Sequence, residues 1–150
     1  MAVNVKLAPY SLGGEVAIAG LTPVTVTYAG RAQNPYPPGN VKVNGVAFPA
    51  TTSGDAVITW NHRYRLGPFI VAQDAADVPL GPEGNYTIVI VINSVTIRTV
   101  TGITGKTYTY TRAQRLIDNA NAALPTSITI TPVNGSLVGT PRTLTFVMGP

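Results

Sequence analysis

The chain has 150 residues, of which 45% are hydrophobic and 11% charged, with a formal net charge of +4 at pH 7 and no cysteine. This length suffices for one domain with its own core, and the lack of cysteine excludes disulfides, thiolate zinc sites and a cysteine nucleophile. The ten basic residues are scattered apart from the group His62, Arg63, Tyr64 and Arg65, so we expect no nucleic-acid partner, because phosphate binding needs several cationic contacts at once.

The residue usage predicts an ordered all-β protein. There are 15 glycines and 13 prolines, and Thr, Val and Ile fill much of the remainder, a mixture that favours many short strands joined by turns. The first 20 residues lack the apolar run of a signal peptide, and the longest apolar stretch, residues 86–92, is too short to cross a bilayer as a helix. We therefore expect no membrane insertion.

Three short β-like segments open the chain, at residues 3–7, 15–19 and 24–28, and a proline-rich stretch follows at 33–39. The prolines exclude helix and central strand and favour a stiff, extended connection. We therefore predict an N-terminal β segment with its linker at 1–36 and a sandwich domain at 37–150. The N-terminal pattern fits three alternatives: part of a neighbouring domain's fold, an extra strand pair on the sandwich, or an arm lent to a neighbouring subunit.

Seven strand signals separated by turn residues follow the linker, a number typical of a β-sandwich. They lie at residues 40–43, 56–60, 86–92, 95–100, 106–110, 127–131 and 142–148. Alternation with a period of two assigns one face of each strand to the core and a mostly Thr, Ser or Asn face to water. The predicted core is Ile58, Trp60, Ile88, Ile90, Ile92, Tyr108, Tyr110, Ile128, Ile130, Leu144, Phe146 and Met148.

The strand at 86–92 departs from this pattern, because Val89 and Val91 are apolar on its second face. Two interpretations remain open. The two valines mark a contact with another subunit or with the N-terminal segment, or the strand is central and covered on both faces by its own chain.

One short helix is predicted near residues 112–124. Thr111 and Gln114 have the spacing of a capping box, and Pro125 would end the helix. The apolar residues that share one helical stripe are Leu116, Ile117, Ala120, Ala123 and Leu124.

The residues provide no convincing active site, and we expect no catalytic residues, no metal and no cofactor. His62 is the only histidine, and the arginines beside it disfavour the imidazolium that a general base must form. Asp74, Asp77 and Glu83 share a loop, but their spacing fits no EF-hand calcium loop, and a polysaccharide hydrolase built on them is the least favoured hypothesis.

Two segments carry a resemblance to a known family. PYPPGNVKVNG at residues 35–45 and VITWNHRYRL at 57–66 resemble the fibronectin type III-like domains of tailed-bacteriophage tail-tip and central-fibre (host-specificity) proteins, and the resemblance extends over residues 28–131. It implies a fibronectin type III or immunoglobulin-like β-sandwich with Trp60 anchoring strand B and Tyr86 in the core of strand C. The last strand differs, since residues 133–142 lack the family's usual Asp-Gly-x-x-Ser-Trp-like sequence.

The resemblance implies a structural or adhesive component of a phage tail, made in the bacterial cytoplasm and located in the virion, that acts by protein–protein binding. Its expected partners are other tail proteins, further copies of itself, or a host receptor or glycan. Because such domains usually belong to longer tail proteins, the chain is either a small separate virion protein or a fragment.

The alternative function is a carbohydrate- or receptor-binding module that uses Tyr36, Tyr64, Arg63 and Arg65. The candidate partner-contact residues are His62, Arg63, Tyr64, Arg65, Val89 and Val91, and the predicted core anchors are Trp60, Tyr86, Tyr108 and Phe146.

Overall fold

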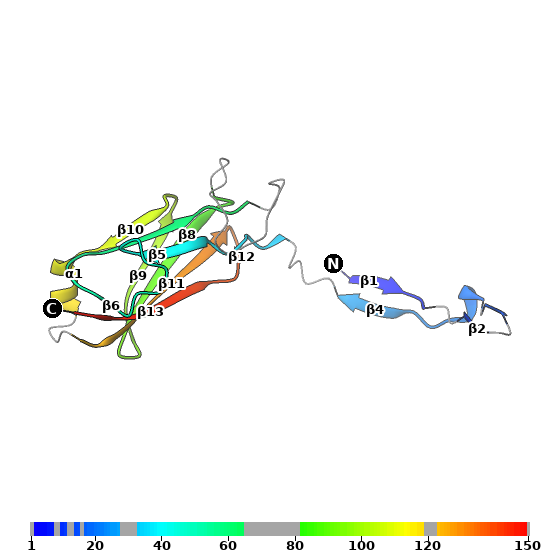
Figure 1. Ribbon diagram of the computed structural model, residues 1–150. Helices are drawn as coiled ribbons and strands as arrows, with labels where there is room; N and C mark the ends of the chain where they lie inside the picture. Colours follow the sequence, from blue (N-terminus) through cyan, green and yellow to red (C-terminus); the bar gives the residue numbers. More distant parts are fainter. Residues whose placement is uncertain are drawn as a thin grey trace. The chain divides into compact units, whose positions relative to one another are not determined.

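The computed structural model describes residues 2–7, 10–11, 14–15, 17–27, 33–64, 82–118 and 123–149 (Figure 1). The chain forms two compact units, Met1–Gln33 and Asn34–Pro150. The first unit contains strands β1 (Ala2–Val5), β2 (Tyr10–Ser11), β3 (Gly14–Glu15) and β4 (Val24–Thr27) and the 3-10 helix η1 (Ile18–Gly20). Within it, β1 pairs antiparallel with β4, and β2 pairs antiparallel with β3.

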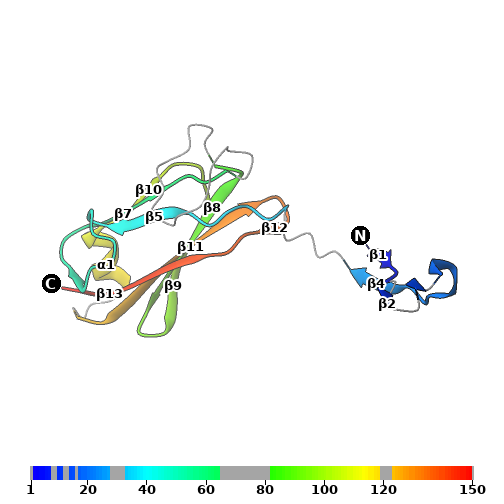
Figure 2. The same ribbon diagram turned by 45° about the vertical axis from the view of Figure 1, so that its right-hand side comes forward.

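The second unit is a sandwich of two sheets, which Figure 2 shows as two layers. The smaller sheet has the order β10-β7-β5, formed by β10 (Thr107–Tyr110), β7 (Ala56–Asn61) and β5 (Gly39–Val43). The larger sheet has the order β6-β13-β11-β8-β9, formed by β6 (Thr51–Thr52), β13 (Arg142–Met148), β11 (Pro125–Asn134), β8 (Asn85–Ile92) and β9 (Val95–Ile103), with β12 (Leu137–Val138) paired to β11. All pairings are antiparallel except that of β6 with β13. The predicted all-β sandwich is confirmed.

The core lies between the two sheets, at the positions that alternate along each strand. In β8 the even-numbered residues from Tyr86 to Ile92 are buried and the odd-numbered ones are half-buried. Trp60 of β7 meets Tyr86 of β8 edge to face, with ring centroids 5.3 Å apart and planes at 71°. This aromatic contact joins the smaller sheet to the larger one.

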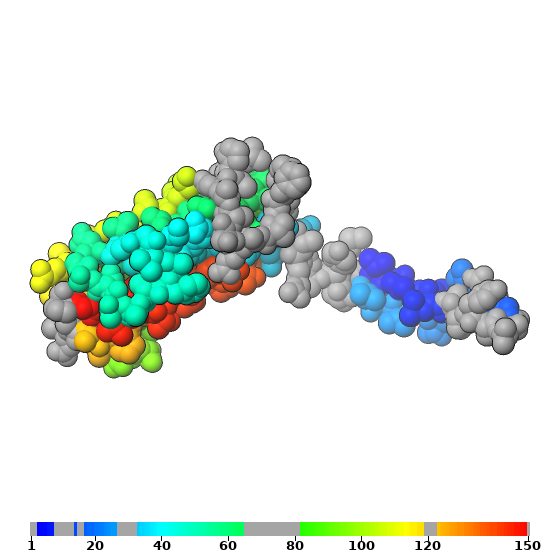
Figure 3. Space-filling model, in the orientation of Figure 1, coloured from blue at the N-terminus to red at the C-terminus, as the bar shows by residue number. Residues whose placement is uncertain are grey.

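Most residues predicted for the core are buried, and the predicted anchors Trp60, Tyr86 and Phe146 are 2–3% exposed. Tyr108 is only partly buried and packs against the edge of the core. The core also contains residues that the alternation did not single out, namely Val41, Val43 and Ala56. Figure 3 shows the sandwich from the side of the smaller sheet, where residues 39–60, in cyan and green, cover the near face.

The helix α1 (Arg112–Asp118) begins where the capping box predicted. The Gln114 backbone N–H donates to Thr111 Oγ1 at 3.2 Å, and the Thr111 N–H donates to Gln114 Oε1 at 3.1 Å. Ala123 has a positive φ of 74°, so the chain has already left the helical conformation there. The helix is therefore shorter than the predicted range, although residues 119–122, including Ala120, lie outside the described part.

The predicted apolar stripe of this helix is wrong. Leu116 is 59% exposed and Ile117 is 82% exposed, whereas Arg115 is buried. The reason is that the guanidinium of Arg115 donates to the carbonyl oxygens of Gly54 and Gly149. The helix is thus held against the end of the sandwich by hydrogen bonds from an arginine, and Leu124 reaches the core from the segment that leads into β11.

Residues 34–39 of the proline-rich stretch belong to the second unit. Pro35 and Pro38 are buried there, while Tyr36 is 38% exposed. At Gly139 an added Cβ would lie 2.1 Å from the carbonyl oxygen of Pro35, so the two backbones approach too closely for any side chain. The segment that the sequence predicted to be a linker therefore contributes two prolines to the packing of the sandwich.

The alternation in β8 leads to a direct test. Replacing Ile90, which is fully buried, with Ala should lower the free energy of unfolding by roughly 2–5 kcal/mol, because it removes buried methyl groups and leaves a cavity. Val89→Ala, one position along the same strand, is the matched control. It should lower the free energy of unfolding by clearly less, because Val89 is only half-buried. Urea denaturation followed by Trp60 fluorescence measures both, and equal losses would contradict the assignment of the two faces.

Candidate functional site

Two of the predicted partner-contact residues are buried. His62 and Arg63, which follow β7, are each 7% exposed. The imidazole of His62 stacks on the ring of Tyr86, with centroids 5.8 Å apart and planes at 5°, and its Nδ1 lies 3.2 Å from the Tyr86 hydroxyl oxygen. The predicted exposed surface at 62–65 is therefore not formed by these two side chains, because the core aromatic pair extends to include His62.

The other two residues of the group, Tyr64 and Arg65, do not form an exposed surface in the described structure. Tyr64 is half-buried, and Arg65 lies outside the described residues. The alternative glycan-binding hypothesis relied on Tyr36, Tyr64, Arg63 and Arg65, and of those that are described only Tyr36 is exposed. Stacking against a sugar needs exposed rings, so the burial of Arg63 and the partial burial of Tyr64 weaken this alternative.

Val89 and Val91 lie on the outer face of the larger sheet, which the strand register defines. Paired residues on neighbouring strands share a face, and the pairings place Thr99, Val89, Thr129 and Thr143 in one row across β9, β8, β11 and β13. The next row is Thr96, Val91, Ser127 and Thr145. We call these eight residues the outer face.

The outer face has a simple chemistry, since all its residues are Thr, Val or Ser and none is charged. Val89 and Val91 are half-buried by their neighbours, while Thr96, Thr99, Thr143 and Thr145 at its borders are exposed. The side chains of Thr129 and Thr143 form a hydrogen bond between β11 and β13, with their Oγ1 atoms 2.8 Å apart. Sequence reasoning found the two valines from the broken alternation, but the threonine rows depend on the register and were missed.

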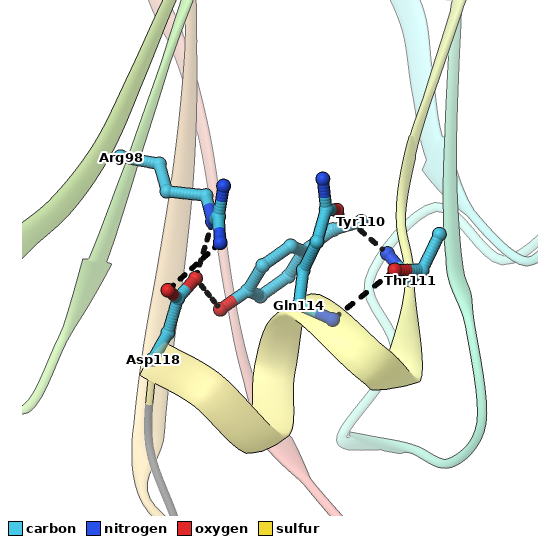
Figure 4. Close-up of polar contacts among 5 residues, drawn as sticks. All are labelled: Arg98, Tyr110, Thr111, Gln114 and Asp118. Carbon is cyan, nitrogen blue, oxygen red and sulfur yellow. Dashed lines mark hydrogen bonds and ion pairs between the residues drawn. The ribbon is translucent and has the colours of Figure 1, made fainter.

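A second group of polar residues lies at the C-terminal end of α1, where Figure 4 shows Arg98 and Tyr110 both pointing at Asp118. Arg98 Nη2 donates to Asp118 Oδ1 at 2.9 Å, and Arg98 Nε donates to Oδ2. The Tyr110 hydroxyl donates to Oδ2 at 2.7 Å, and the guanidinium lies 5.9 Å from the Tyr110 ring centroid. These contacts connect β9, β10 and α1. No sequence signal identified them, because the three residues lie on three different elements and meet only through tertiary packing.

The electrostatics of this group favour a structural role. Burial opposes ionisation of Asp118, but the hydrogen bonds from Arg98 and Tyr110 and the charge of Arg98 outweigh it and hold the pKa of Asp118 below its ordinary value. Burial, followed by the hydrogen bond to Asp118, raises the pKa of Tyr110. Both groups therefore keep their ordinary protonation states at neutral pH, which does not suit a general acid or base.

The carboxylates considered for catalysis or calcium binding are not brought together in the described structure. Asp74 and Asp77 lie outside the described residues, and Glu83 is half-buried. Within the described ranges, no three His, Asp or Glu side chains group as a metal site. In the same part of the chain, no helix has the length and apolar character needed to cross a membrane.

No family model matches the chain. No curated protein matches it either. Among solved structures, the chain is similar to domains d3–d4 of the rat CD45 extracellular region, with 14% sequence identity and a TM-score of 0.50 over 98% of this chain and 63% of that chain. The fold is a fibronectin type III-like β-sandwich.

Two further solved structures are similar at lower TM-scores. A computationally redesigned β-sandwich protein has 22% identity and a TM-score of 0.46, over 75% of this chain and 94% of that chain. The FN1–FN3 domains of chicken CNTN1 have 12% identity and a TM-score of 0.40, over 85% of this chain and 38% of that chain. The chain spans less than two thirds of the CD45 fragment, and the likeness concerns the fibronectin type III-like fold alone.

The Asp118 contacts predict a pH-dependent effect on stability. Because the folded-state pKa of Asp118 lies below its ordinary value of 3.8, its ionised form stabilises the fold above that value, and this contribution is lost as the pH falls through the lower folded-state pKa. Asp118→Asn should therefore be less stable than the native chain at pH 7, and the difference should shrink below pH 3.8.

Urea denaturation between pH 7 and pH 2.5 measures this difference. Leu116→Gln is the control, since it changes an exposed, uncharged side chain on the same helix, and its difference from the native chain should stay constant over this range. A difference for Asp118→Asn that persists unchanged to pH 2.5 would contradict the role of the carboxylate.

Proposed function

We propose that this protein is a structural or adhesive component of a bacteriophage tail that acts by binding other proteins through the outer face of the larger sheet. The observation that carries the proposal is the composition of that face, in which threonine and serine flank Val89 and Val91 within each row and no residue is charged. The chain carries sixteen charged residues, ten basic and six acidic, and none of them lies on the outer face.

Such a face suits protein binding for physical reasons. Bringing it against a partner removes no charge from water, and the removal of charge is the most costly part of burying polar surface. Val and Thr are branched at Cβ and hold few rotamers, so little side-chain entropy is lost on contact. Two sheets packed face to face lie about 10 Å apart, a distance that such short side chains can fill.

The assignment to a phage tail is supported by sequence. Residues 35–45 and 57–66 resemble the domains of tail-tip and central-fibre proteins. The fibronectin type III-like fold agrees with that resemblance. On this proposal the protein is made in the bacterial cytoplasm and functions in the virion, where its partners are other tail proteins.

The test uses tails purified from the phage that encodes the chain. The 150-residue chain should bind them. Val89→Lys should weaken binding at least tenfold, or by roughly 1.4 kcal/mol or more, because it places a charge on the outer face. Val57→Lys is the matched control, since Val57 is exposed on the smaller sheet, and it should bind as the native chain does.

Circular dichroism establishes that both variants are folded before they are compared. Equal binding by Val89→Lys and the native chain would contradict the role of the outer face. Absence of the protein from purified virions, judged with an antibody to the recombinant chain, together with no binding to tails, would contradict the location in the tail.

A further inference from the structure

The chain contains two Asn-Gly pairs, Asn44-Gly45 and Asn134-Gly135, and each follows a valine. The first pair forms the turn after β5, and the second lies where β11 turns into β12. Before a glycine, the main-chain nitrogen can approach the asparagine side-chain amide closely, because glycine has no Cβ and takes many conformations. The two pairs have nearly the same local sequence, so differences in their reactivity depend on the fold.

The side-chain amide of Asn44 is fixed by three hydrogen bonds. Its Oδ1 accepts from the Val57 backbone N–H at 2.8 Å. Its Nδ2 donates to Thr52 Oγ1 at 2.6 Å and to the Asp55 carbonyl oxygen at 3.1 Å. Attack by the Gly45 nitrogen requires the amide carbon to turn toward it, and these hydrogen bonds hold the amide away from that geometry.

The side-chain amide of Asn134 is not fixed in this way. Asn134 is exposed, and so are Gly135 and Ser136, which form the turn. Within the part of the chain that the structure describes, the Asn134 amide has no hydrogen-bond partner. It can therefore rotate toward the Gly135 nitrogen, and water reaches both groups.

We propose that Asn134 is a site of spontaneous deamidation, whereas Asn44 is protected by the fold. The Gly135 nitrogen, after losing its proton to the solvent, attacks Cγ of Asn134. The new N–Cγ bond closes a succinimide ring, the Cγ–Nδ2 bond breaks, and the amide nitrogen takes a proton from the solvent and leaves as ammonia. Water then opens the ring at either carbonyl group and gives aspartate or isoaspartate.

The products differ from asparagine in charge and in main-chain length. A carboxylate replaces the amide, so the formal net charge of the chain falls by one from +4. In isoaspartate the main chain also gains a methylene group. At Gly84 an added Cβ would lie 2.2 Å from the Val133 carbonyl oxygen and 2.9 Å from Asn134 Cα, so the two main chains are closely packed there. Isoaspartate should therefore disturb the packing of this turn against Gly84.

This inference goes beyond the proposed function, because it concerns the β11–β12 turn and a reaction with water alone. Asn134 is not one of the eight residues of the outer face. A chain that deamidates at Asn134 without binding tails would contradict only the proposed function. A chain that binds tails and keeps Asn134 intact would overturn only the inference made here.

Incubation of the 150-residue chain at mildly alkaline pH, followed by peptide mapping with mass spectrometry, is the first test. Deamidation at Asn134 should be at least roughly tenfold faster than at Asn44, because only the Asn134 amide can reach the reactive geometry. Both aspartate and isoaspartate should form, and oxygen from labelled water should enter the new carboxyl group. Equal rates at the two sites, or aspartate without isoaspartate, would overturn the inference.

The same incubation in concentrated urea is the matched control. Unfolding removes the hydrogen bonds of Asn44, so the sequences Val43-Asn44-Gly45 and Val133-Asn134-Gly135 should then react at similar rates. No reaction at Asn134 in the folded chain, over a time in which the unfolded chain reacts, would overturn the inference.

Ion-exchange chromatography of a variant is the second test. The native chain should develop a more acidic form with time, whereas Asn134→Gln should not, because the longer glutamine side chain would have to close a larger ring. Circular dichroism establishes that the variant is folded. An acidic form that appears equally fast in Asn134→Gln would overturn the assignment of the site to Asn134.

Discussion

The edge-to-face contact of Trp60 with Tyr86 sets the arrangement of the sandwich, because it joins β7 of one sheet to β8 of the other. Once Tyr86 points inward, alternation requires Ile88, Ile90 and Ile92 to point inward too, and places Val89 and Val91 outside. A register shift of one residue would exchange the two faces and expose the isoleucines. The uncharged outer face is thus a consequence of the same register that builds the core.

Polar contacts hold α1 against one end of the sandwich. Arg115 donates to two carbonyl groups, and Asp118 accepts from Arg98 and Tyr110. These groups fix a short helix that presents its apolar residues Leu116 and Ile117 to solvent. A seven-residue helix is too short to be stable by itself, so these tertiary contacts are what keep it in place.

The strands and most of the core could be predicted from the sequence because period-two alternation is local and the inward residues are large and apolar. The capping box of Thr111 and Gln114 was predictable for the same reason, since both partners lie within one turn. The burial of Arg115 and His62 could not be predicted, because their partners, Gly149 and Tyr86, are distant in the sequence. Only the valines of the outer face could be predicted, because they break the alternation. The threonine rows could not, because they depend on the pairing between strands.

The central claim is that the buried core of the second unit provides most of the stability of the chain, while the N-terminal unit, in which no described side chain within residues 3–26 is buried, adds little. Hydrogen–deuterium exchange of the intact 150-residue chain tests this most directly. Backbone amides of β8 and β11 should exchange orders of magnitude more slowly than those of β1 and β4. Protection of β1 and β4 equal to that of β8 would show that the N-terminal unit is as stable as the sandwich, and would contradict this claim.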